Sequence, residues 1–550
     1  MKIRTIKVHN FRSIADVSVR VHDYTLVVGA NNGGKSNLVD AIRCFYGELQ
    51  FDKERDLPRA KGIVGKDGES YVQIEFSEVD SKIDLGPWEE FKKKRTLHVR
   101  RYLASPDSKM NGRYCVVGMK GDPLNKAKVL QKLPAGMGKI TYIPSMSKPA
   151  EELKTTGPSA LRDLIGDVFS ETVESSKEYR KFKKVVEQFS KGMHALKNAN
   201  GFSIDAIEEK VNGSLGNWNA QFRVGLKTLS PQDILKGLLT VSIEDRFAGE
   251  NMELDQFGSG FQRSVISELI KTKAMLASKA KSEVPRLLIF EEPEAFLHQD
   301  QQEELARSLK EIAEHGTQVI CTSHSQAFVS RKIDDMTGIV RLVRNNGVTA
   351  AYQIDEKSWE ELKNPVSPFS ERLAKFVKRR TLELDFYRYV CWFDTNRSNV
   401  FFSTRALLVE GATESALIAR LADDGKLKLP AGTIVIDCLG KFNYFRFIRM
   451  LNAYGIRLAA VIDSDSGKTG EDLEEQEAWN DFIESEVDKC NGNATFWKIP
   501  NDLEGYLRIN PVKKGDGDLK PYNVLKEYEA EKYDKKQLEA FCRKIEELLR

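Results

Sequence analysis

A glycine-rich loop near the start of the chain constrains the fold more than any other feature. The segment Gly29–Ser36 fits G-x-x-x-x-G-K-[ST] in full, directly after the apolar run Leu26–Val28 and before a helical pattern. In such a loop, glycines let backbone N–H groups surround phosphates, Lys35 adds a positive charge, and the Ser36 hydroxyl can ligate Mg²⁺. A chance glycine turn would lack this strand and helix. The motif therefore predicts a nucleotide-binding α/β domain.

An apolar strand far along the chain supplies acidic partners for that loop. Residues 287–290 are Leu-Leu-Ile-Phe, and Glu291-Glu292-Pro293-Glu294 follows directly. At the tip of a buried strand one carboxylate can hold Mg²⁺ and its neighbour can polarise a water. We expect Glu291 to hold the metal and Glu292 to activate water, rather than both to lie in an acidic surface turn.

Two shorter motifs accompany the loop and the acids. Residues 257–262, Phe-Gly-Ser-Gly-Phe-Gln, form a glycine turn at the start of a helical pattern, where free N–H groups can receive a phosphate. The strand pattern 319–321 leads to His324, which is a packing residue or a polar group at a strand tip.

The pattern of periodicities divides the chain into parts. Strand patterns dominate the beginning, a stretch rich in Glu, Lys and Leu at helical spacing follows, and βα alternation restarts near residue 401. We expect an α/β ATPase head (1–148 and 233–360), a helical insertion (149–232), a helical connector (361–400) and a second parallel-sheet domain (401–550).

Two acidic clusters stand at strand ends in the last of these parts. Glu410 ends one short apolar strand and Glu414 lies one turn into the next helix. Asp463 and Asp465 end another strand, and side chains at i and i+2 on extended backbone point to one side. Carboxylates are the ligands that Mg²⁺ prefers, and ligand sites gather at the carboxyl ends of parallel strands. The clusters predict a metal site rather than scattered surface acids.

Composition excludes several other classes. Hydrophobic residues make up 41% and charged residues 30%, and no apolar stretch is long enough to span a membrane. The seven cysteines are scattered without a C-x-x-C pair, so we expect reduced thiols in a cytoplasmic protein. With 84 Lys and Arg against 81 Asp and Glu, the net charge of +3 neither requires nor excludes nucleic acid.

The P-loop, the glycine turn, the acidic strand and His324, in this order, resemble the ABC-type ATPases of the SMC, Rad50 and RecF group. The opening residues 10–13, Asn-Phe-Arg-Ser, are similar to that group's first motif. The resemblance implies ATP bound between two copies, with Glu292 as the catalytic glutamate. The turn matches the group's L-S-G-G-Q signature only in part. The nucleotide-binding residues that it implies are Arg12, Asn31, Gly33, Gly34, Lys35, Ser36, Asn37, Ser259, Gly260, Gln262 and His324.

The C-terminal part resembles the Toprim domain of topoisomerases, primases and related nucleases. A strand-tip glutamate before glycine, Glu410-Gly411, and a D-x-D motif are that fold's signatures. An ATPase head with a helical insertion followed by Toprim resembles the OLD (overcoming lysogenization defect) nucleases and the Gabija nuclease subunit. The catalytic residues implied are Glu292, Glu410, Asp463, Asp465, Glu504 and Lys520. The metal ligands implied are Ser36, Glu291, Glu410, Glu414, Asp463, Asp465, Asp502 and Glu504.

These resemblances imply an ATP-dependent DNA endonuclease that uses two metal ions, Mg²⁺ or Mn²⁺, in antiviral defence or DNA processing. We expect a homodimer or a higher oligomer, with the insertion as the contact, and a helicase or another defence protein as a partner. A Toprim topoisomerase or primase and a non-enzymatic ATP-switched DNA clamp are the alternatives. A topoisomerase would need a covalently reacting tyrosine, for which Tyr387 and Tyr506 lack a diagnostic setting.

Two basic stretches are candidate DNA contacts. Lys92 to Arg95 with Arg100 and Arg101 form the first, and Lys375 with residues 378–380 forms the second. For each stretch a solvated face is the more common explanation.

Overall fold

A computed structural model of the 550-residue chain is the basis of the description. It describes residues 1–58, 67–79, 83–93, 96–118, 123–124, 129–145, 173, 176–193, 196, 203–215, 220–224, 242–245, 249–253, 256–258, 260–262, 264–266, 268–269, 272, 285–295, 297–329, 333–363, 371–377, 397–510 and 519–550. The chain forms two compact units. The first comprises Met1–Ile140, Lys281–Ala295 and Gln302–Arg550, and the second comprises Thr141–Ala280 and Phe296–Gln301. The expected insertion lies within the second unit, and its exact bounds remain a prediction.

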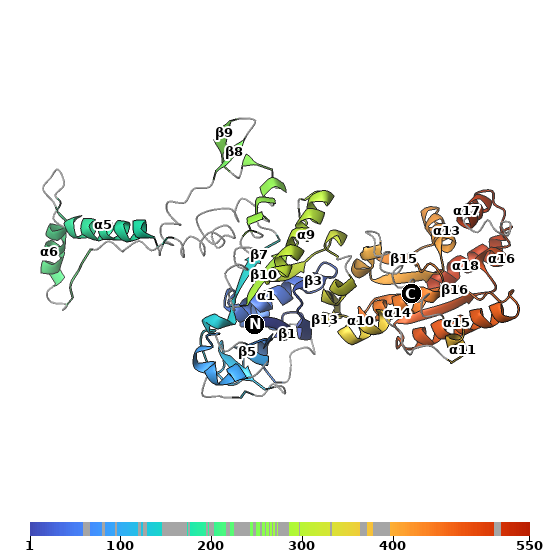
Figure 1. The fold of residues 1–550 in the computed structure, drawn as a ribbon, viewed down its shortest axis with the longest axis horizontal. Coiled ribbons are helices and arrows are strands. Elements are labelled where there is room, and N and C mark those ends of the chain that lie inside the picture. The colour runs from blue at the N-terminus through green and yellow to red at the C-terminus, as the bar shows by residue number, and fades with distance from the viewer. Residues whose placement is uncertain are drawn as a thin grey trace. The chain divides into compact units, whose positions relative to one another are not determined.

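The head is built on a mixed sheet that has eleven strands among the described residues (Figure 1). In sheet order they are β6 (Tyr114–Val117), β5 (Thr96–Ala104), β4 (Ser70–Ser77), β1 (Lys2–Phe11), β2 (Ile14–Arg20), β13 (Val348–Tyr352), β12 (Ile339–Asn345), β3 (Tyr24–Val28), β11 (Gln318–Thr322), β10 (Arg286–Glu291) and β7 (Lys139–Ile143). Strands β12, β3, β11 and β10 run parallel, whereas β6, β5, β4, β1 and β2 pair antiparallel.

The sequence of each strand accounts for its place in that sheet. Every residue of β3, Tyr-Thr-Leu-Val-Val, is buried, as expected for a parallel strand covered on both faces. In β2 buried and exposed positions alternate, which fits a strand with one face toward solvent. The buried strands β3, β11 and β10 therefore end at one edge of the sheet, where the predicted phosphate and acid motifs follow.

Helices and short 3-10 turns complete the head. The helices are α1 (Lys35–Tyr46), α2 (Lys53–Asp56), α9 (Gln299–Glu314) and α10 (Glu356–Lys363). The short helix α11 (Glu371–Ala374) instead buries Leu373 in a cluster with Phe445 and Trp479 of the C-terminal domain. The 3-10 turns span Gly86–Lys93, Ala135–Met137, Gln326–Phe328 and Ile333–Gly338. Gly47, at φ 81°, ends α1 in the left-handed conformation that glycine adopts without strain.

The second unit is described only in part. Its elements are α5 (Lys177–Met193), α6 (Ile204–Leu215), β8 (Ile243–Asp245) and β9 (Glu250–Met252). Helices α5 and α6 lie within residues 149–232, where the sequence predicts a helical insertion.

The C-terminal domain contains a four-stranded parallel sheet. In sheet order its strands are β15 (Thr433–Asp437), β14 (Arg405–Val409), β16 (Arg457–Asp463) and β17 (Ala494–Ile499). Its helices are α13 (Ala412–Asp423), α14 (Tyr444–Ala453), α15 (Glu471–Asp488), α16 (Leu503–Leu507), α17 (Lys520–Glu529) and α18 (Lys535–Leu548). The 3-10 turns Arg397–Phe402 and Lys441–Asn443 complete it. This is the α/β sheet with crossover helices that the βα alternation predicts.

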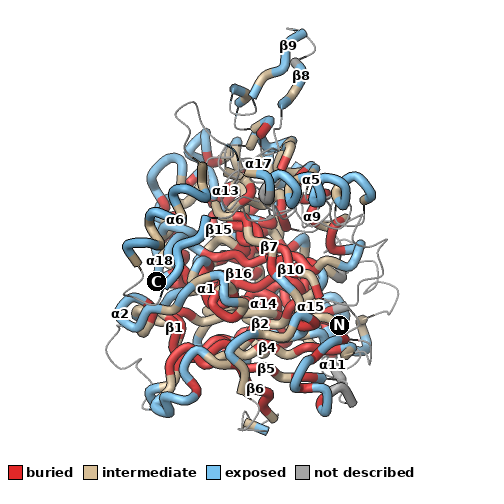
Figure 2. The backbone as a smooth tube through the Cα atoms, turned by 90° about the vertical axis from the view of Figure 1, so that its left-hand side faces the viewer, coloured by how far each residue is buried: buried red, intermediate tan, exposed pale blue. Residues whose placement is uncertain are grey.

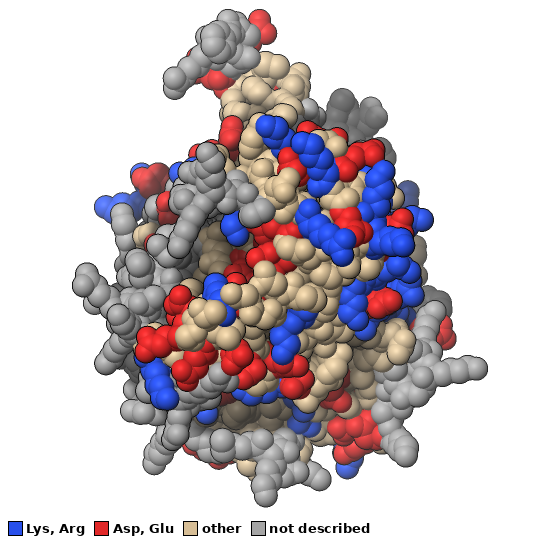
Figure 3. All heavy atoms as spheres, turned by 90° about the vertical axis from the view of Figure 1, so that its right-hand side faces the viewer, with Lys and Arg blue, Asp and Glu red and all other residues tan. Residues whose placement is uncertain are grey.

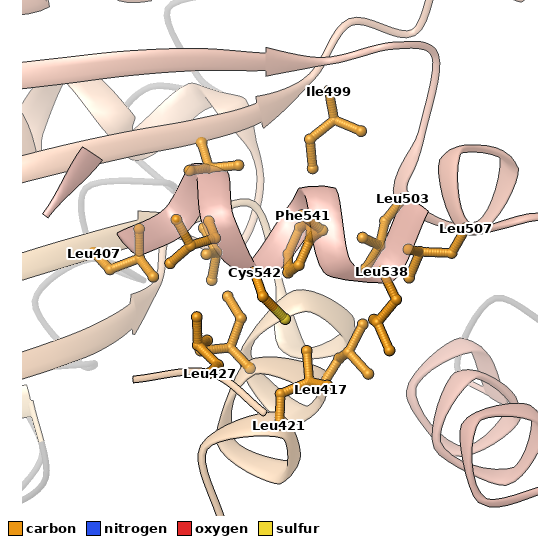
Figure 4. Packing of buried hydrophobic residues seen from close by; sticks show 14 of the residues in the cluster. Leu407, Leu417, Leu421, Leu427, Ile499, Leu503, Leu507, Leu538, Phe541 and Cys542 are labelled. Carbon is orange, nitrogen blue, oxygen red and sulfur yellow. The ribbon is translucent and has the colours of Figure 1, made fainter. Parts of the chain in front are cut away.

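Apolar side chains of several helices pack together beside this sheet. Leu417 and Leu421 of α13 lie close to Phe541 and Cys542 of α18 in one buried cluster (Figure 4). Leu407 of β14 belongs to the same cluster. In Figure 2 the buried stretches follow the strands, while many helices carry exposed stretches. The apolar residues of α13 and α18 thus bury one face of each helix in the same cluster as residues of the sheet.

Arg341 of β12 joins the head sheet to the C-terminal domain within the first unit. Its guanidinium donates to the carbonyls of Tyr454 (2.9 Å), Gly455 (3.1 Å) and Ser403 (2.7 Å). Only 5% of Arg341 is exposed, and burial lowers its pKa to about 10. Three carbonyls thus accept from the terminal nitrogens of this buried cation, while its Nε has no hydrogen-bond partner.

Two expectations from composition bear on the fold. Six cysteines, at 44, 115, 321, 438, 490 and 542, are free and buried, and Cys391 lies outside the described residues. Among the residues that the structure describes, no helix has the length and apolarity to cross a membrane.

Candidate active sites

The P-loop is held by glycine geometry that other residues would disturb. Gly34 caps α1 at φ 109°, and Gly29, at φ 145°, lies against the backbone of β12. A Cβ on Gly29 would come within 2.2 Å of the Leu342 carbonyl oxygen, and one on Gly34 within 2.5 Å of Thr349 Oγ1. These close approaches explain why the loop needs glycine at both positions.

Lys35 lies at the centre of the predicted phosphate site. It is 6% exposed, and its ammonium donates to the carbonyls of Gly29 (3.0 Å) and Ala30 (3.3 Å). It also donates to Nε2 of His324 at 2.6 Å, so that imidazole is the acceptor. Burial lowers the pKa of both side chains, and the Lys35 charge further lowers that of His324. The structure thus brings the P-loop lysine and His324, one of the predicted nucleotide-binding residues, together.

The acidic end of β10 lies beside His324, the partner of Lys35. Glu291 is buried at the end of β10, while Glu292 adopts a positive φ of 43° and its carboxylate lies 3.7 Å from His324 Nε2. Glu294 accepts from the Ser323 hydroxyl (2.9 Å) and the His324 backbone N–H (2.6 Å). Burial raises the pKa of Glu294. The buried carboxylate of Glu294 therefore ties the β10 end to the loop that carries His324.

Residues 10–13, near the start of the chain, form hydrogen bonds with neighbouring side chains. Arg12, at φ 51°, donates to Asp56 (2.8 Å) and Asp40 (2.7 Å), and Asn37 donates to the Ser13 hydroxyl at 2.7 Å. Asn31 and Ser36 are exposed, and Gly33 is buried against β12. The structure therefore places Arg12 and Asn37 beside the loop, and a direct role for either in nucleotide binding stays a prediction.

The predicted signature lies in the second unit. Gln262 is 5% exposed and its amide donates to the Phe257 carbonyl at 2.7 Å. Phe257 and Phe261 stack with ring centroids 4.8 Å apart. A Cβ on Gly260 would lie 3.2 Å from Gln301 Oε1, and Ser259 is outside the described residues. The described part of the turn is thus stabilised by its own contacts, and its role toward ATP remains a prediction.

The C-terminal acids meet where the sheet order reverses. Strand β14 is followed in sequence by β15 on one side, whereas β16 returns to its other side. Loops leave such a switch point in opposite directions and open a crevice between the strand ends. Glu410 follows β14 and Asp463 ends β16, and both line a pocket of about 300 Å³. Gly411, Thr413, Glu414, Leu439, Gly440, Glu504 and Lys520 also line it.

Burial and mutual repulsion act on the pocket carboxylates. Burial, aided by neighbouring carboxylates, raises the pKa of Asp463 to about 9 and that of Glu414 to about 7. Burial also raises the pKa of Glu410, an effect that the nearby Lys441 opposes. Asp463 Oδ1 and Glu410 Oε2 are buried and have no hydrogen-bond partner. Uncompensated buried oxygens of this kind are costly unless a cation approaches them.

Other pocket acids already have partners. Glu414 Oε2 accepts the Gly411 N–H at 2.9 Å, and Glu504 lies 3.2 Å from the Lys520 ammonium. Asp502 accepts the Gly505 N–H at 2.7 Å as the N-cap of α16 and is absent from the pocket lining. Within the described parts of the chain, no three His, Cys, Asp or Glu side chains are arranged around one common point.

Asp465 is absent from the pocket lining and is paired with two lysines. Its carboxylate contacts the Lys441 ammonium, and Lys468 lies 3.1 Å from its other oxygen. Lys441, which the sequence analysis missed, is 3% exposed. Its position four residues after the end of β15, in Gly440-Lys441, was the available signal, because β15 neighbours the strand that precedes Glu410.

The other expected groups have different surroundings. Arg100 is buried over the Tyr71 ring (3.9 Å) and donates to Gln73, and Arg101 donates to the Cys44 carbonyl, so both stabilise the head. Tyr506 packs against Trp497 in the C-terminal core. Lys375 is exposed. Tyr387, residues 94–95 and 378–380, and the side chains of Lys92 and Lys93 lie outside what the structure describes.

Two family descriptions match the chain. An AAA ATPase domain matches residues 1–101 and 124–329, which is more than half of the chain. The Toprim domain of overcoming lysogenization defect protein-like sequences matches residues 401–465, which include Glu410 and Asp463.

Three curated relatives match this chain to different extents. The Old nuclease of Escherichia phage P2 is 26% identical over 482 residues, covering 84% of this chain and 77% of the relative. The OLD nuclease of Thermus scotoductus is 24% identical over 558 residues, covering 95% and 94%. Endonuclease GajA of Bacillus cereus is 25% identical over 269 residues, covering 45% and 37%.

Among solved structures, the SMC head domain of Thermotoga maritima matches 64% of this chain and 100% of its own, with 17% identity and a TM-score of 0.33. An SMC head bound to the C-winged helix domain of ScpA covers 66% and 100%, with 17% identity and a TM-score of 0.39. Because the first of these family matches spans more than half of its length, the chain belongs to the AAA ATPase domain family, and its residues 401–465 match the Toprim domain of overcoming lysogenization defect protein-like sequences.

Proposed function

We propose that the chain is an ATP-dependent, metal-dependent DNA endonuclease whose phosphodiester hydrolysis takes place in the C-terminal acidic pocket. The observation that carries this proposal is the pair of buried oxygens without a hydrogen-bond partner, Asp463 Oδ1 and Glu410 Oε2, in a pocket at the switch point of a parallel sheet. The names of the relatives, which are nucleases, support the same activity.

The pocket residues suit a hard divalent cation. Carboxylate oxygens are the preferred ligands of Mg²⁺ and Mn²⁺, and the two unpartnered oxygens would gain a counter-ion. Asp463, Glu410 and Glu414 would hold the ion, after side-chain rotation that brings their oxygens together. When bound, it would supply an activated water and charge stabilisation at the scissile phosphate. Lys520, which lies next to Glu504 at the pocket, would neutralise charge on that phosphate.

The head would bind ATP and regulate cutting. Lys35 donates to two P-loop carbonyls and to His324, so an incoming phosphate would compete for its three donor positions. Glu292 lies 3.7 Å from that histidine and would orient the attacking water, with Glu291 and Ser36 at the Mg²⁺. We place this activity in antiviral defence or DNA processing, with a helicase or another defence protein as a partner.

Supercoiled plasmid separates the candidate functions. The chain is incubated with plasmid and Mg²⁺ or Mn²⁺, with and without ATP. The proposal expects nicked or linear DNA. Relaxed closed circles would indicate a topoisomerase, and intact plasmid under all conditions would leave a DNA clamp as the better account.

We also propose that a second copy of the chain covers the apolar face of α5. Phe182, Val185 and Phe189 lie on one side of this helix and are 38%, 61% and 57% exposed. Residues spaced by three and four share a helix face, and a stripe of this kind is ordinarily buried. The length of the stripe fits an antiparallel or parallel helix pair across a two-fold axis.

Light scattering tests this contact on the full chain. Replacing Phe182, Val185 and Phe189 with Ser should shift the mass from dimer to monomer. The matched control replaces the exposed polar residues Lys183, Lys184 and Glu187 of the same helix with Ser. A dimer that survives the first triple substitution would rule out this face.

A further inference from the structure

Lys441 brings a positive charge into the acidic site from a strand that the sequence motifs do not include. It begins the 3-10 turn between β15 and α14. Its ammonium donates to the Asp465 carboxylate and, at 3.0 Å, to Gln476 Oε1. It also lies 4.0 Å from Glu410 Oε2. A lysine that is 3% exposed therefore stands between a β14 carboxylate and the second carboxylate of the D-x-D motif.

The backbone around Lys441 fixes this position. The Gly440 N–H donates to the Glu410 carbonyl at 2.7 Å, so the turn is bonded to the tip of β14. Asn443 donates to the Cys438 carbonyl at 3.2 Å and accepts from Arg446 at 2.9 Å. Asn443 and Arg446 are themselves buried. The buried turn that carries Lys441 is thus bonded to the tip of β14, which makes Lys441 part of the site rather than a surface group folded over it.

The acids of the site fall into two groups by their partners. Asp465 has an ammonium at each oxygen, from Lys441 and Lys468, and its own N–H donates to the Asn501 carbonyl at 2.8 Å. Asp463 Oδ1 and Glu410 Oε2, in contrast, have no hydrogen-bond partner. The place for a cation between Asp465 and Glu410 is thus filled by an ammonium, while the place at Asp463 is open.

We propose that Lys441 is a built-in cation that occupies one of the two cation positions of the site. Without DNA, the site then takes a single divalent ion, held at Asp463. The two-cation chemistry expected from the sequence is supplied by one metal ion and one ammonium. Lysine is a compact point charge, which suits it to stand in for an ion among carboxylates. This inference rests on the proposed nuclease function, because it concerns the same pocket.

Counting bound Mn²⁺ tests the proposal without any cleavage readout. The metal-free full chain is titrated with Mn²⁺ by calorimetry, and bound Mn²⁺ is counted by electron paramagnetic resonance. Nucleotide is omitted so that no phosphate recruits an ion to the P-loop. The wild type should bind one ion that Asp463→Asn removes. Lys441→Met, which keeps the side-chain length and deletes the charge, should bind two.

Matched variants separate charge from structure. Lys441→Arg keeps a cation and should bind one ion. Lys468→Met removes the other ammonium at Asp465, but Lys468 is 44% exposed and lies 3.1 Å from the oxygen that faces away from Lys441, so one ion is expected. Circular dichroism checks that each variant is folded.

Each outcome bears on one claim. A wild type that binds two ions sensitive to Asp463→Asn overturns the role of Lys441, even if Lys441→Met fails to fold. A folded Lys441→Met protein that binds only one ion overturns it as well. If the wild type binds no ion that Asp463→Asn removes, the proposed nuclease site itself is wrong.

Discussion

Replacing Arg341 with Met would break the junction between the head sheet and the C-terminal domain. Met fills a similar volume but donates no hydrogen bond, so the carbonyls of Tyr454, Gly455 and Ser403 would lose their donor. Tyr454 and Gly455 lie in the turn before β16, and Ser403 lies two residues before β14. The loss would thus fall on the two strands that carry Asp463 and Glu410.

The size of the effect follows from the three bonds. A hydrogen bond to a charged donor contributes about 1.5–3 kcal/mol, and relief of the buried charge offsets part of the sum. We therefore expect the free energy of unfolding to fall by about 3–5 kcal/mol. With a urea dependence of roughly 3 kcal/mol per M, the midpoint would fall by about 1–1.7 M.

Urea unfolding followed by tryptophan fluorescence measures this shift. Arg344→Met is the matched control, because Arg344 lies on the same strand but is exposed, and we expect a change within about 0.5 kcal/mol. An Arg341→Met protein whose midpoint equals that of the wild type would refute the reasoning, since the junction would then add nothing to stability.

Two further predictions concern the head and the C-terminal domain. Lys35→Ala should abolish ATP binding in a calorimetric titration, because it removes the only P-loop side-chain cation, and unchanged affinity would remove the P-loop assignment. Glu486, 1% exposed, is paired with Arg449 and Lys489; burial alone would raise its pKa, but these hydrogen bonds outweigh burial and lower it. Glu486→Gln should therefore destabilise the protein by about 2–3 kcal/mol at pH 7. A carboxyl whose pKa is lower in the folded than in the unfolded protein contributes its full stability only above the unfolded-state pKa. The difference in stability between Glu486→Gln and the wild type should therefore shrink as the pH falls below about 4. A difference that is constant between pH 7 and pH 3 would contradict this.

Local patterns predicted the parts of the site that a short segment defines. The P-loop, the end of β10 and the Glu410 and Asp463 strand tips lie as expected because each combines a buried strand with an adjacent motif. Their spatial pairing, Lys35 with His324 and Glu410 with Asp463, also follows from parallel strand ends meeting at one edge.

Contacts between distant segments were beyond the sequence. Lys441 lies 24 residues from Asp465, and nothing in its own neighbourhood shows that its ammonium turns toward that carboxylate. In the sequence Arg341 resembles any other strand residue, because its carbonyl partners lie 62 to 114 residues away. Arg100 and Arg101 read as a basic surface, but the pairing of β4 with β5 turns Arg100 onto Tyr71. In each case tertiary packing, rather than local propensity, decides the role.

The central claim is that DNA is cut in the C-terminal pocket while ATP is hydrolysed in the head. Paired assays on two variants test it most directly: nicking of supercoiled DNA and release of phosphate from ATP, for Asp463→Ala and Glu292→Gln. Asp472→Asn, an exposed acid of the same domain, is the control. The account predicts that Asp463→Ala loses cleavage and keeps ATP turnover, whereas Glu292→Gln loses ATP turnover and keeps the Mn²⁺ bound at Asp463. An Asp463→Ala protein that nicks DNA at the wild-type rate would contradict the account.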